Sequence, residues 1–280
     1  MKDKKPKNSY QDQSGQFCYR YPRAAITSDS VIFGFDGNEL KILLVERGVE
    51  PFKGMWALPG GFMKMDESIE QCAARELREE TNISNVYLEQ FEVFSRPDRD
   101  PRGRVVTVAF IALVRPSDYE VIAGDDAALA VWFSASMLPP LAFDHKEIID
   151  KACIRLREIL RVRPVAFRLL EDIFTVDELR KVYEAVNGTT YDRRNFQRKL
   201  MASQIVEPIS AISDCVSCDC NGLSVERATA PSPRSPGRKA SKLLRLKNKC
   251  FSKNSSLDSF GLPDLKESSS DDSIKDLFNF

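Results

Sequence analysis

The chain has 280 residues, which is enough for one sizeable domain and a smaller second one. Its 41 lysines and arginines balance its 41 aspartates and glutamates, so the net charge indicates no class of partner. No apolar run is long enough to span a membrane, and the polar N-terminus lacks the apolar core of a secretory signal. Seven cysteines without such a signal are typical of free thiols in a reducing compartment. We therefore expect a cytoplasmic protein with no membrane partner.

The first part of the chain has the pattern of a series of strands. Residues 1–21 are polar and are predicted to be a disordered lead. Apolar, β-branched runs at residues 24–35 and 39–46 flank Asp36-Gly37-Asn38, which is a hairpin signal. Because more strands and two helices follow, we expect a mixed sheet with helices on both faces. The later strands are predicted at residues 56–58, 86–94, 105–114 and 130–134, and an amphipathic closing helix at residues 146–161.

A glutamate-rich helix is predicted within Gly61–Ile83 (GFMKMDESIEQCAARELREETNI), because its second half consists of strong helix formers. Glu79 is three residues and Glu80 four residues after Glu76, so the three carboxylates share one face. Arg75 can pair with Glu79 at i,i+4. Like charges on one face repel each other, and a bound Mg²⁺ would offset that repulsion. Taken alone, the pattern fits a solvated charged face equally well.

The residues in front of this helix favour a ligand site. Leu58-Pro59-Gly60-Gly61 is a turn where the backbone can approach a ligand closely. The turn and the helix together have the spacing G-x5-E-x7-R-E-L-x-E-E, which resembles the Nudix box, the signature of Nudix hydrolases. Asn82 stands where the box normally has glycine, and asparagine tolerates the left-handed backbone of such a helix end. The matched positions are Gly61, Glu67, Arg75, Glu76, Glu79 and Glu80.

The resemblance implies a fold and a set of roles. It implies an α/β fold, a Nudix-type α/β/α sandwich with a mixed sheet, over residues 22–162. It also implies Mg²⁺ or Mn²⁺ as the cofactor. Glu79 or Glu80 would take the proton of the attacking water, and Arg75 would orient the carboxylates, so these three are the predicted catalytic residues. The metal ligands that the resemblance implies are Gly61, Glu76, Glu79 and Glu80.

Four arginines lie in the loop Ser95–Arg104 (SRPDRDPRGR) between two predicted strands. Charged loops are mostly exposed connections, but arginine meets phosphate or carboxylate bidentately in a way that lysine cannot. The loop resembles that of ADP-ribose-type Nudix proteins and their regulatory relatives, which implies a role in ligand binding. The predicted substrate-binding residues are Arg96, Arg99, Arg102 and Arg104.

Other polar residues near the end of this domain are expected to have other roles. Asp144 is placed to cap the closing helix, and His145 to pack at its entry. His145 is the sole histidine, so no histidine-based metal site can be built. Related Nudix sequences often have glutamate where this chain has Leu129, which leaves Asp125 or Asp126 as candidates for a further acidic residue.

Residues 163–248 have a helical pattern and are predicted to form a second, smaller domain. Thr175 and Glu178 form a capping box in front of a helix that ends at Gly188, and Asp192 caps the next helix. That helix is rich in arginine, asparagine and glutamine, which suit DNA phosphates and base edges, although a solvated helical cap fits equally well. The candidate DNA-binding residues are Arg193, Arg194, Asn195, Gln197 and Arg198.

The segment FTVDELRKVYEAVNGTTYDRRNFQRKLMASQIVEPI is similar to the winged helix fused behind Nudix domains in regulators of nicotinamide-nucleotide metabolism. In that family the Nudix domain can sense ADP-ribose, and the winged helix binds operator DNA. Residues 237–246 are expected to supply the final wing strand, after an insertion at residues 213–236. Cys215 and Cys218 in the insertion make only half of a zinc site. Residues 249–280 are predicted to be a disordered tail.

Two functions from different classes remain. We favour a Nudix hydrolase that uses Mg²⁺ to cleave the pyrophosphate bond of a nucleoside diphosphate derivative, ADP-ribose above all. A pure sensor has no need of the full set of glutamates, which this chain keeps. The alternative is an ADP-ribose-sensing transcriptional regulator that binds double-stranded DNA through the winged helix. A two-fold operator would need a homodimer, although the sequence leaves the oligomeric state open.

Overall fold

The computed structural model divides into two compact units, Met1–Glu158 and Ile159–Phe280. The structure describes residues 9–11, 17–19, 21–119, 127–209 and 243–247. Several predictions therefore lie outside the described residues: Asp125 and Asp126, the insertion at residues 213–236 with its cysteines, and the tail at residues 249–280.

Part of the predicted disordered lead has regular structure. Ser9–Gln11 (β1) and Phe17–Tyr19 (β2) pair as short antiparallel strands. The rest of the lead, up to residue 20, lies outside the described residues.

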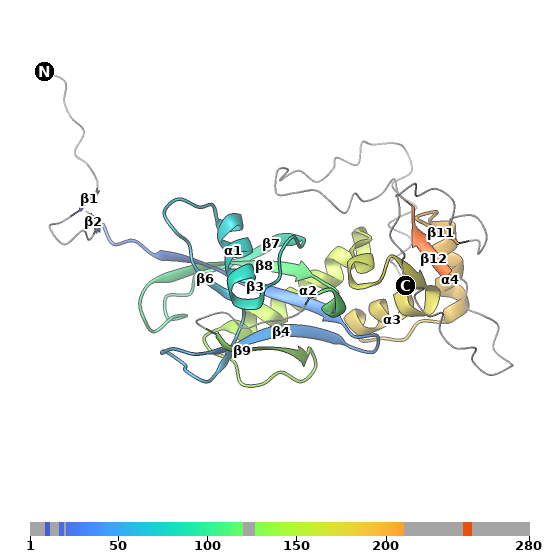
Figure 1. The fold of residues 1–280 in the computed structure, drawn as a ribbon, viewed down its shortest axis with the longest axis horizontal. Helices are drawn as coiled ribbons and strands as arrows, with labels where there is room; N and C mark the ends of the chain where they lie inside the picture. Colours follow the sequence, from blue (N-terminus) through green and yellow to red (C-terminus); the bar gives the residue numbers. More distant parts are fainter. Residues whose placement is uncertain (1–8, 12–16, 20, 120–126, 210–242, 248–280) are drawn as a thin grey trace, which may run out of the picture. The chain divides into compact units, whose positions relative to one another are not determined.

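A seven-stranded mixed sheet forms the centre of the first unit (Figure 1). β3 pairs in parallel with β8 on one side and antiparallel with β4 on the other, and β7 pairs with the far edge of β8. β9 pairs antiparallel with β4. The strand predicted at residues 105–114 is β8, which has a partner on both edges and is almost wholly buried. The strands are β3 (Ala25–Phe35), β4 (Leu40–Arg47), β5 (Trp56–Ala57), β6 (Gly60–Phe62), β7 (Leu88–Phe94), β8 (Val105–Leu113) and β9 (Ala127–Ser134).

The glycine turn enters the sheet between β3 and β4. These strands pair next to their hairpin, where Ile32 lies opposite Leu43. Farther along, β4 pairs with β5 and β3 pairs with β6, so the segment that joins β5 to β6 separates the two strands. β6 was missed in the sequence because glycine is depleted in strands. The inserted segment holds the turn Leu58–Gly61 beside β3.

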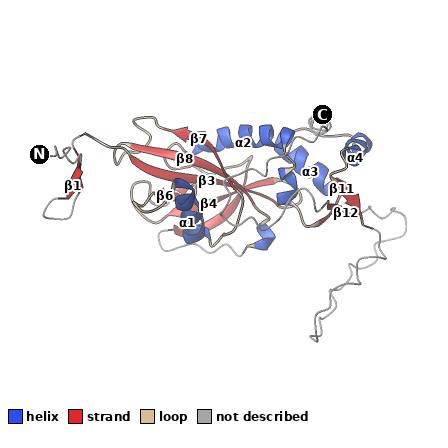
Figure 2. Ribbon diagram, turned by 90° about the horizontal axis from the view of Figure 1, so that it is seen from above, coloured by secondary structure: helices blue, strands red, loops and turns tan. Residues whose placement is uncertain are grey.

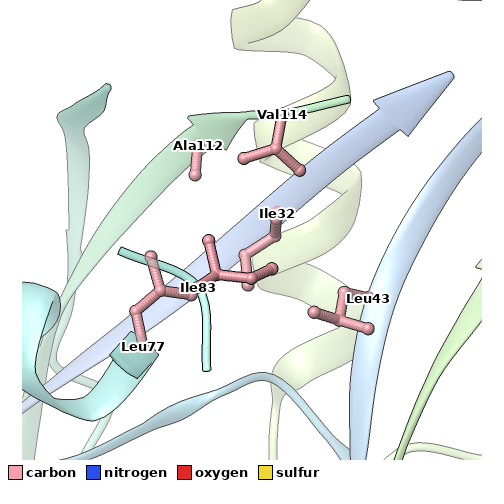
Figure 3. Packing of buried hydrophobic residues seen from close by; sticks show 6 residues of the cluster. All are labelled: Ile32, Leu43, Leu77, Ile83, Ala112 and Val114. Atoms are coloured by element: carbon pink, nitrogen blue, oxygen red, sulfur yellow. The ribbon is translucent and has the colours of Figure 1, made fainter. Parts of the chain in front are cut away.

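One helix covers each face of this sheet (Figure 2). α1 (Ile69–Thr81) begins at a capping box made by Ser68 and Gln71. It ends at Asn82, whose φ of 60° is the predicted left-handed cap. On the opposite face, α2 (His145–Val162) buries an apolar stripe against the sheet. The side chains that pack between α1 and the sheet are Ile32, Leu43, Leu77, Ile83, Ala112 and Val114 (Figure 3). The predicted sandwich is thus confirmed.

The second unit is a small helical domain with a three-stranded antiparallel sheet of order β10-β12-β11. Thr175 and Glu178 form the predicted capping box, and Gly188 ends the helix with a φ of 65°. Leu243–Leu246 (β12) pairs with both other strands, so the expected wing strand is confirmed. The remaining elements of this unit are η2 (Val165–Leu169), β10 (Ile173–Thr175), α3 (Val176–Asn187), α4 (Arg193–Ala202) and β11 (Val206–Pro208).

No helix among the described residues is both long enough and apolar enough to cross a membrane.

Candidate functional site

A cavity of about 300 Å³ opens where the glycine turn separates β3 from β4. Glu76 and Glu80 of α1 line it together with Gly60 and Gly61 of the turn. Its other walls come from β3, the end of β4, the arginine loop and the start of α2; they include Thr27, Asp29, Arg47, Phe62, Arg99, Arg102, Phe143 and His145. The site therefore brings together segments that are far apart in the sequence.

Arg75 organises the glutamates of α1. Its guanidinium bonds bidentately to Glu67, with N–O distances of 2.8 and 2.6 Å. Nη1 of the same group also donates to Glu76, at 2.7 Å, and to Glu79, at 3.0 Å. The predicted i,i+4 pair with Glu79 is thus confirmed, and two further carboxylates share the same arginine. Its hydrogen bonds to Glu67 lower the pKa of that carboxyl to about 2. Glu67 is therefore negatively charged at neutral pH.

Glu76 lies directly against the glycine turn. A Cβ atom added at Gly61 would come within 2.3 Å of Glu76 Oε1, so the carboxylate occupies space that only glycine leaves open. Burial raises the pKa of Glu76. The arrangement places a carboxylate beside the Gly61 peptide, which the resemblance assigns to the metal site.

Glu80 reaches the same turn from the end of α1. Its Oε2 accepts a hydrogen bond from the Gly60 N–H at 2.8 Å. Burial, with smaller contributions from the nearby carboxylates of Glu76 and Asp29, raises the pKa of Glu80 to about 8. A carboxyl with such a pKa can exchange a proton near neutral pH, which is what a general base requires. The environment of Glu79 differs from that of the buried Glu80, because the Glu79 side chain is half exposed.

The four arginines of the loop have different environments. Arg99 is buried and forms a bidentate ion pair with Asp144. Arg102 lines the cavity, with its guanidinium 5.0 Å from the ring centre of Phe62. Arg96 is half exposed, and Arg104 donates to backbone carbonyls of its own loop. Neither Arg96 nor Arg104 is among the residues that line the cavity.

Asp144 and His145 do more than the sequence predicted. Both carboxylate oxygens of Asp144 accept hydrogen bonds from Arg99, at 2.8 and 3.0 Å. The carboxylate that was expected to cap α2 is therefore part of a buried ion pair. His145 does lie buried at the start of α2, and its Nδ1 also accepts from the Leu58 N–H at 2.9 Å.

Asp29, Thr27 and Arg47 belong to the site, and the sequence reasoning missed them. Asp29 is a buried charge inside an apolar strand, which was the available signal, because such a charge needs a partner. Among the described residues, Thr27 Oγ1 is buried without a hydrogen-bond partner. Arg47 lies over the ring of Phe143, 4.9 Å from its centre. Nothing in the sequence marked Thr27 or Arg47.

In the second unit, α4 separates an apolar face from a basic one. Phe196 and Leu200 are buried in the core of the unit. On the solvent side, Arg193 pairs with Asp177 at 2.9 Å. Of the candidate DNA-binding residues, Asn195 is partly buried and the others are exposed. The full set is Arg193, Arg194, Asn195, Gln197 and Arg198.

Comparison with known proteins covers both units. Residues 26–152 match the NUDIX domain model, and residues 166–215 match the model of the NrtR DNA-binding winged helix domain. The chain is 36% identical over 190 residues to the ADPR responsive transcriptional repressor NtrR of Acinetobacter baylyi, covering 67% of this chain and 76% of that protein. It is 43% identical over 129 residues to the ADP-ribose pyrophosphatase of Methanocaldococcus jannaschii, covering 46% and 73%.

A solved structure resembles the chain over both units. Shewanella oneidensis NrtR, crystallised with a 27mer DNA, superposes with a TM-score of 0.58 at 29% identity. The match covers 79% of this chain and 93% of that one.

Proposed function

The chain belongs to the Nudix proteins that carry an NrtR-type DNA-binding winged helix domain, and from this premise we propose that it hydrolyses ADP-ribose and binds DNA. The observation that carries the hydrolytic part is that two carboxylates of α1, Glu76 and Glu80, line the cavity beside the glycine turn. Glu76 and Glu80 both contact the glycine turn, and Arg75 holds Glu76 and Glu79 in place. The DNA-binding part rests on the exposed basic side of α4.

The residues around the cavity fit Mg²⁺ or Mn²⁺. Carboxylate oxygens and a backbone carbonyl are the hard ligands that these ions prefer. Glu76, Glu79 and Glu80 would hold the ion together with the carbonyl of Gly61. Among the described residues, no three acidic, histidine or cysteine side chains form a ready-made metal cage.

The chemistry follows from the charges at the cavity. The bound ion would neutralise the pyrophosphate and lower the pKa of the attacking water. Glu79 or Glu80 would accept the proton of that water as the general base. Arg102, whose side chain lines the cavity, would bind the remainder of the ligand. The Acinetobacter repressor and the Methanocaldococcus enzyme are both named for ADP-ribose, which supports this ligand.

A second candidate function is a ligand-responsive repressor that does not hydrolyse its ligand. The similarity to the Acinetobacter repressor favours it, because that match spans both units whereas the match to the pyrophosphatase spans 129 residues. Leu129 also stands half exposed at a position where related Nudix sequences often have glutamate. In either case the winged helix would bind double-stranded DNA, and a two-fold operator would require a homodimer.

Product formation from ADP-ribose with Mg²⁺ tests the proposal. Wild type should release AMP and ribose 5-phosphate, and Glu80→Gln should be slower by on the order of 10²-fold or more, as expected for a lost general base. Glu70→Gln, which removes a carboxylate of the same helix that does not line the cavity, is the matched control and should keep wild-type activity. If no variant hydrolyses ADP-ribose while the ligand still raises the melting temperature, the repressor alternative holds.

A further inference from the structure

The glycine turn is held from both faces of the sheet. From α1, Glu80 accepts the Gly60 N–H, and from the first residue of α2, His145 accepts the Leu58 N–H. Leu58 and His145 are 87 residues apart in the sequence. Each bond fixes one peptide plane, because a backbone N–H is a single donor. The two bonds therefore set the orientation of the peptide groups that lead into Gly61.

The histidine is itself held in one orientation. Because Nδ1 accepts a hydrogen bond, the proton of the neutral ring is on Nε2. Nε2 points to Asp29, with 3.8 Å between it and Oδ1. Asp29 is in turn 3.4 Å from Nη2 of Arg99, which bonds bidentately to Asp144, the residue before the histidine. The ring thus lies in a closed, buried network.

Packing alone does not account for this geometry. The ring contacts Phe143, with 5.3 Å between the ring centres, and a phenyl ring could fill the same space. A phenyl ring would leave the buried Leu58 N–H without its acceptor, which is unfavourable. Burial lowers the pKa of His145, so the ring stays neutral and keeps Nδ1 available as an acceptor.

We infer that His145 is a positioning residue of the hydrolytic site: by accepting the Leu58 N–H it orients the turn that presents Gly60 to Glu80 and Gly61 to the metal. The inference rests on the proposed hydrolytic function. His145 lines the cavity, and the role inferred for it is exerted through the backbone of the turn rather than through a bond to the metal or the ligand. Groups that orient metal ligands in this way typically contribute on the order of 10- to 100-fold to affinity or rate.

Two substitutions separate the hydrogen bond from the packing. His145→Asn keeps an acceptor at the position of Nδ1, whereas His145→Phe keeps an aromatic ring without an acceptor. His145→Phe should lower kcat with ADP-ribose by on the order of 10- to 100-fold, with little change in KM. His145→Asn should restore most of that loss. If His145→Phe has wild-type kcat, or if the two variants are equally slow, the inference is wrong.

Two measurements do not depend on hydrolysis. Binding of Mn²⁺ alone to the full chain, followed by water-proton relaxation, should weaken in His145→Phe and recover in His145→Asn. Because the chain has a single histidine, one long-range ¹H–¹⁵N spectrum of wild type reports its tautomer directly. A proton on Nε2 supports the inference, and a proton on Nδ1 overturns it. If wild type does not hydrolyse ADP-ribose, the proposed function fails, and these two measurements alone decide the role of His145.

Discussion

Replacing Arg99 by methionine should strongly destabilise the first unit. The residue is 4% exposed, and its Nη2 lies 2.8 Å from Asp144 and 3.4 Å from Asp29, both of which are also buried. Methionine fills much of the same space but leaves two buried carboxylates without their cation. Removing one member of a buried ion pair typically costs about 3–5 kcal/mol. The matched variant Arg96→Met removes a half-exposed arginine of the same loop and should cost about 1 kcal/mol or less.

Urea unfolding of the full chain followed by tryptophan fluorescence measures this difference. The chain has two tryptophans, Trp56 and Trp132, and both lie in the first unit, so the signal reports that unit alone. With a urea dependence of about 1–3 kcal/mol per molar, the midpoint of Arg99→Met should fall by at least about 1 M. Equal midpoints for Arg99→Met and Arg96→Met would refute the structural role. A raised KM for ADP-ribose at unchanged stability would instead support the prediction that Arg99 binds the ligand.

Four further predictions follow from individual contacts. Gly61→Ala should fold but lose on the order of 10- to 100-fold in kcat, because its Cβ would displace the flexible end of Glu76; wild-type kcat would contradict this. Asn82→Ala should lower the free energy of unfolding by about 1 kcal/mol, because alanine is disfavoured at a φ of 60°, whereas Asn82→Gly should have little effect; equal urea midpoints for the two variants would contradict this. Since the pKa of Glu80 is raised to about 8 in the folded state, its contribution to the stability of the metal-free protein is full below about pH 4.5 and is lost as the pH rises through 8. The urea midpoint in EDTA should therefore fall between pH 6 and pH 8.5, and Glu80→Gln should lose most of that fall; an unchanged fall would show that other groups cause it. Arg194→Ala should weaken DNA binding and reduce its salt dependence by about one counterion while hydrolysis stays unchanged; an unchanged salt slope in gel shifts would place this side chain away from the phosphates.

The elements whose signals lie within a few residues were predictable from the sequence. The capping box of Thr175 and Glu178 forms as expected. Asn82 adopts the left-handed conformation that the Nudix box requires at the end of α1. Arg75 and Glu79 meet because residues four apart are neighbours on any helix. In each case one local backbone geometry fixes the outcome, so the sequence alone was sufficient.

The environments of the arginines in the loop at residues 95–104 could not be predicted from the neighbouring sequence. Arg96 and Arg99 are three residues apart and chemically identical, yet one is half exposed and the other is buried. What separates them is the position of Asp144, 45 residues further along, which only the packing of α2 against the sheet brings to Arg99. A spacing pattern cannot contain that information, because the partner is set by the fold and not by the neighbouring sequence.

The sequence by itself determined that this protein has a glycine turn followed by a helix with Arg75 and three glutamates in fixed register, and that a winged helix follows. The tertiary structure alone decided which groups hold that turn. β6 is a strand only because β3 lies beside it, and His145 meets Leu58 only because α2 begins under the turn. Such contacts join segments that are far apart in the sequence. They therefore contribute to the stability of the fold only when the sheet and both helices have assembled.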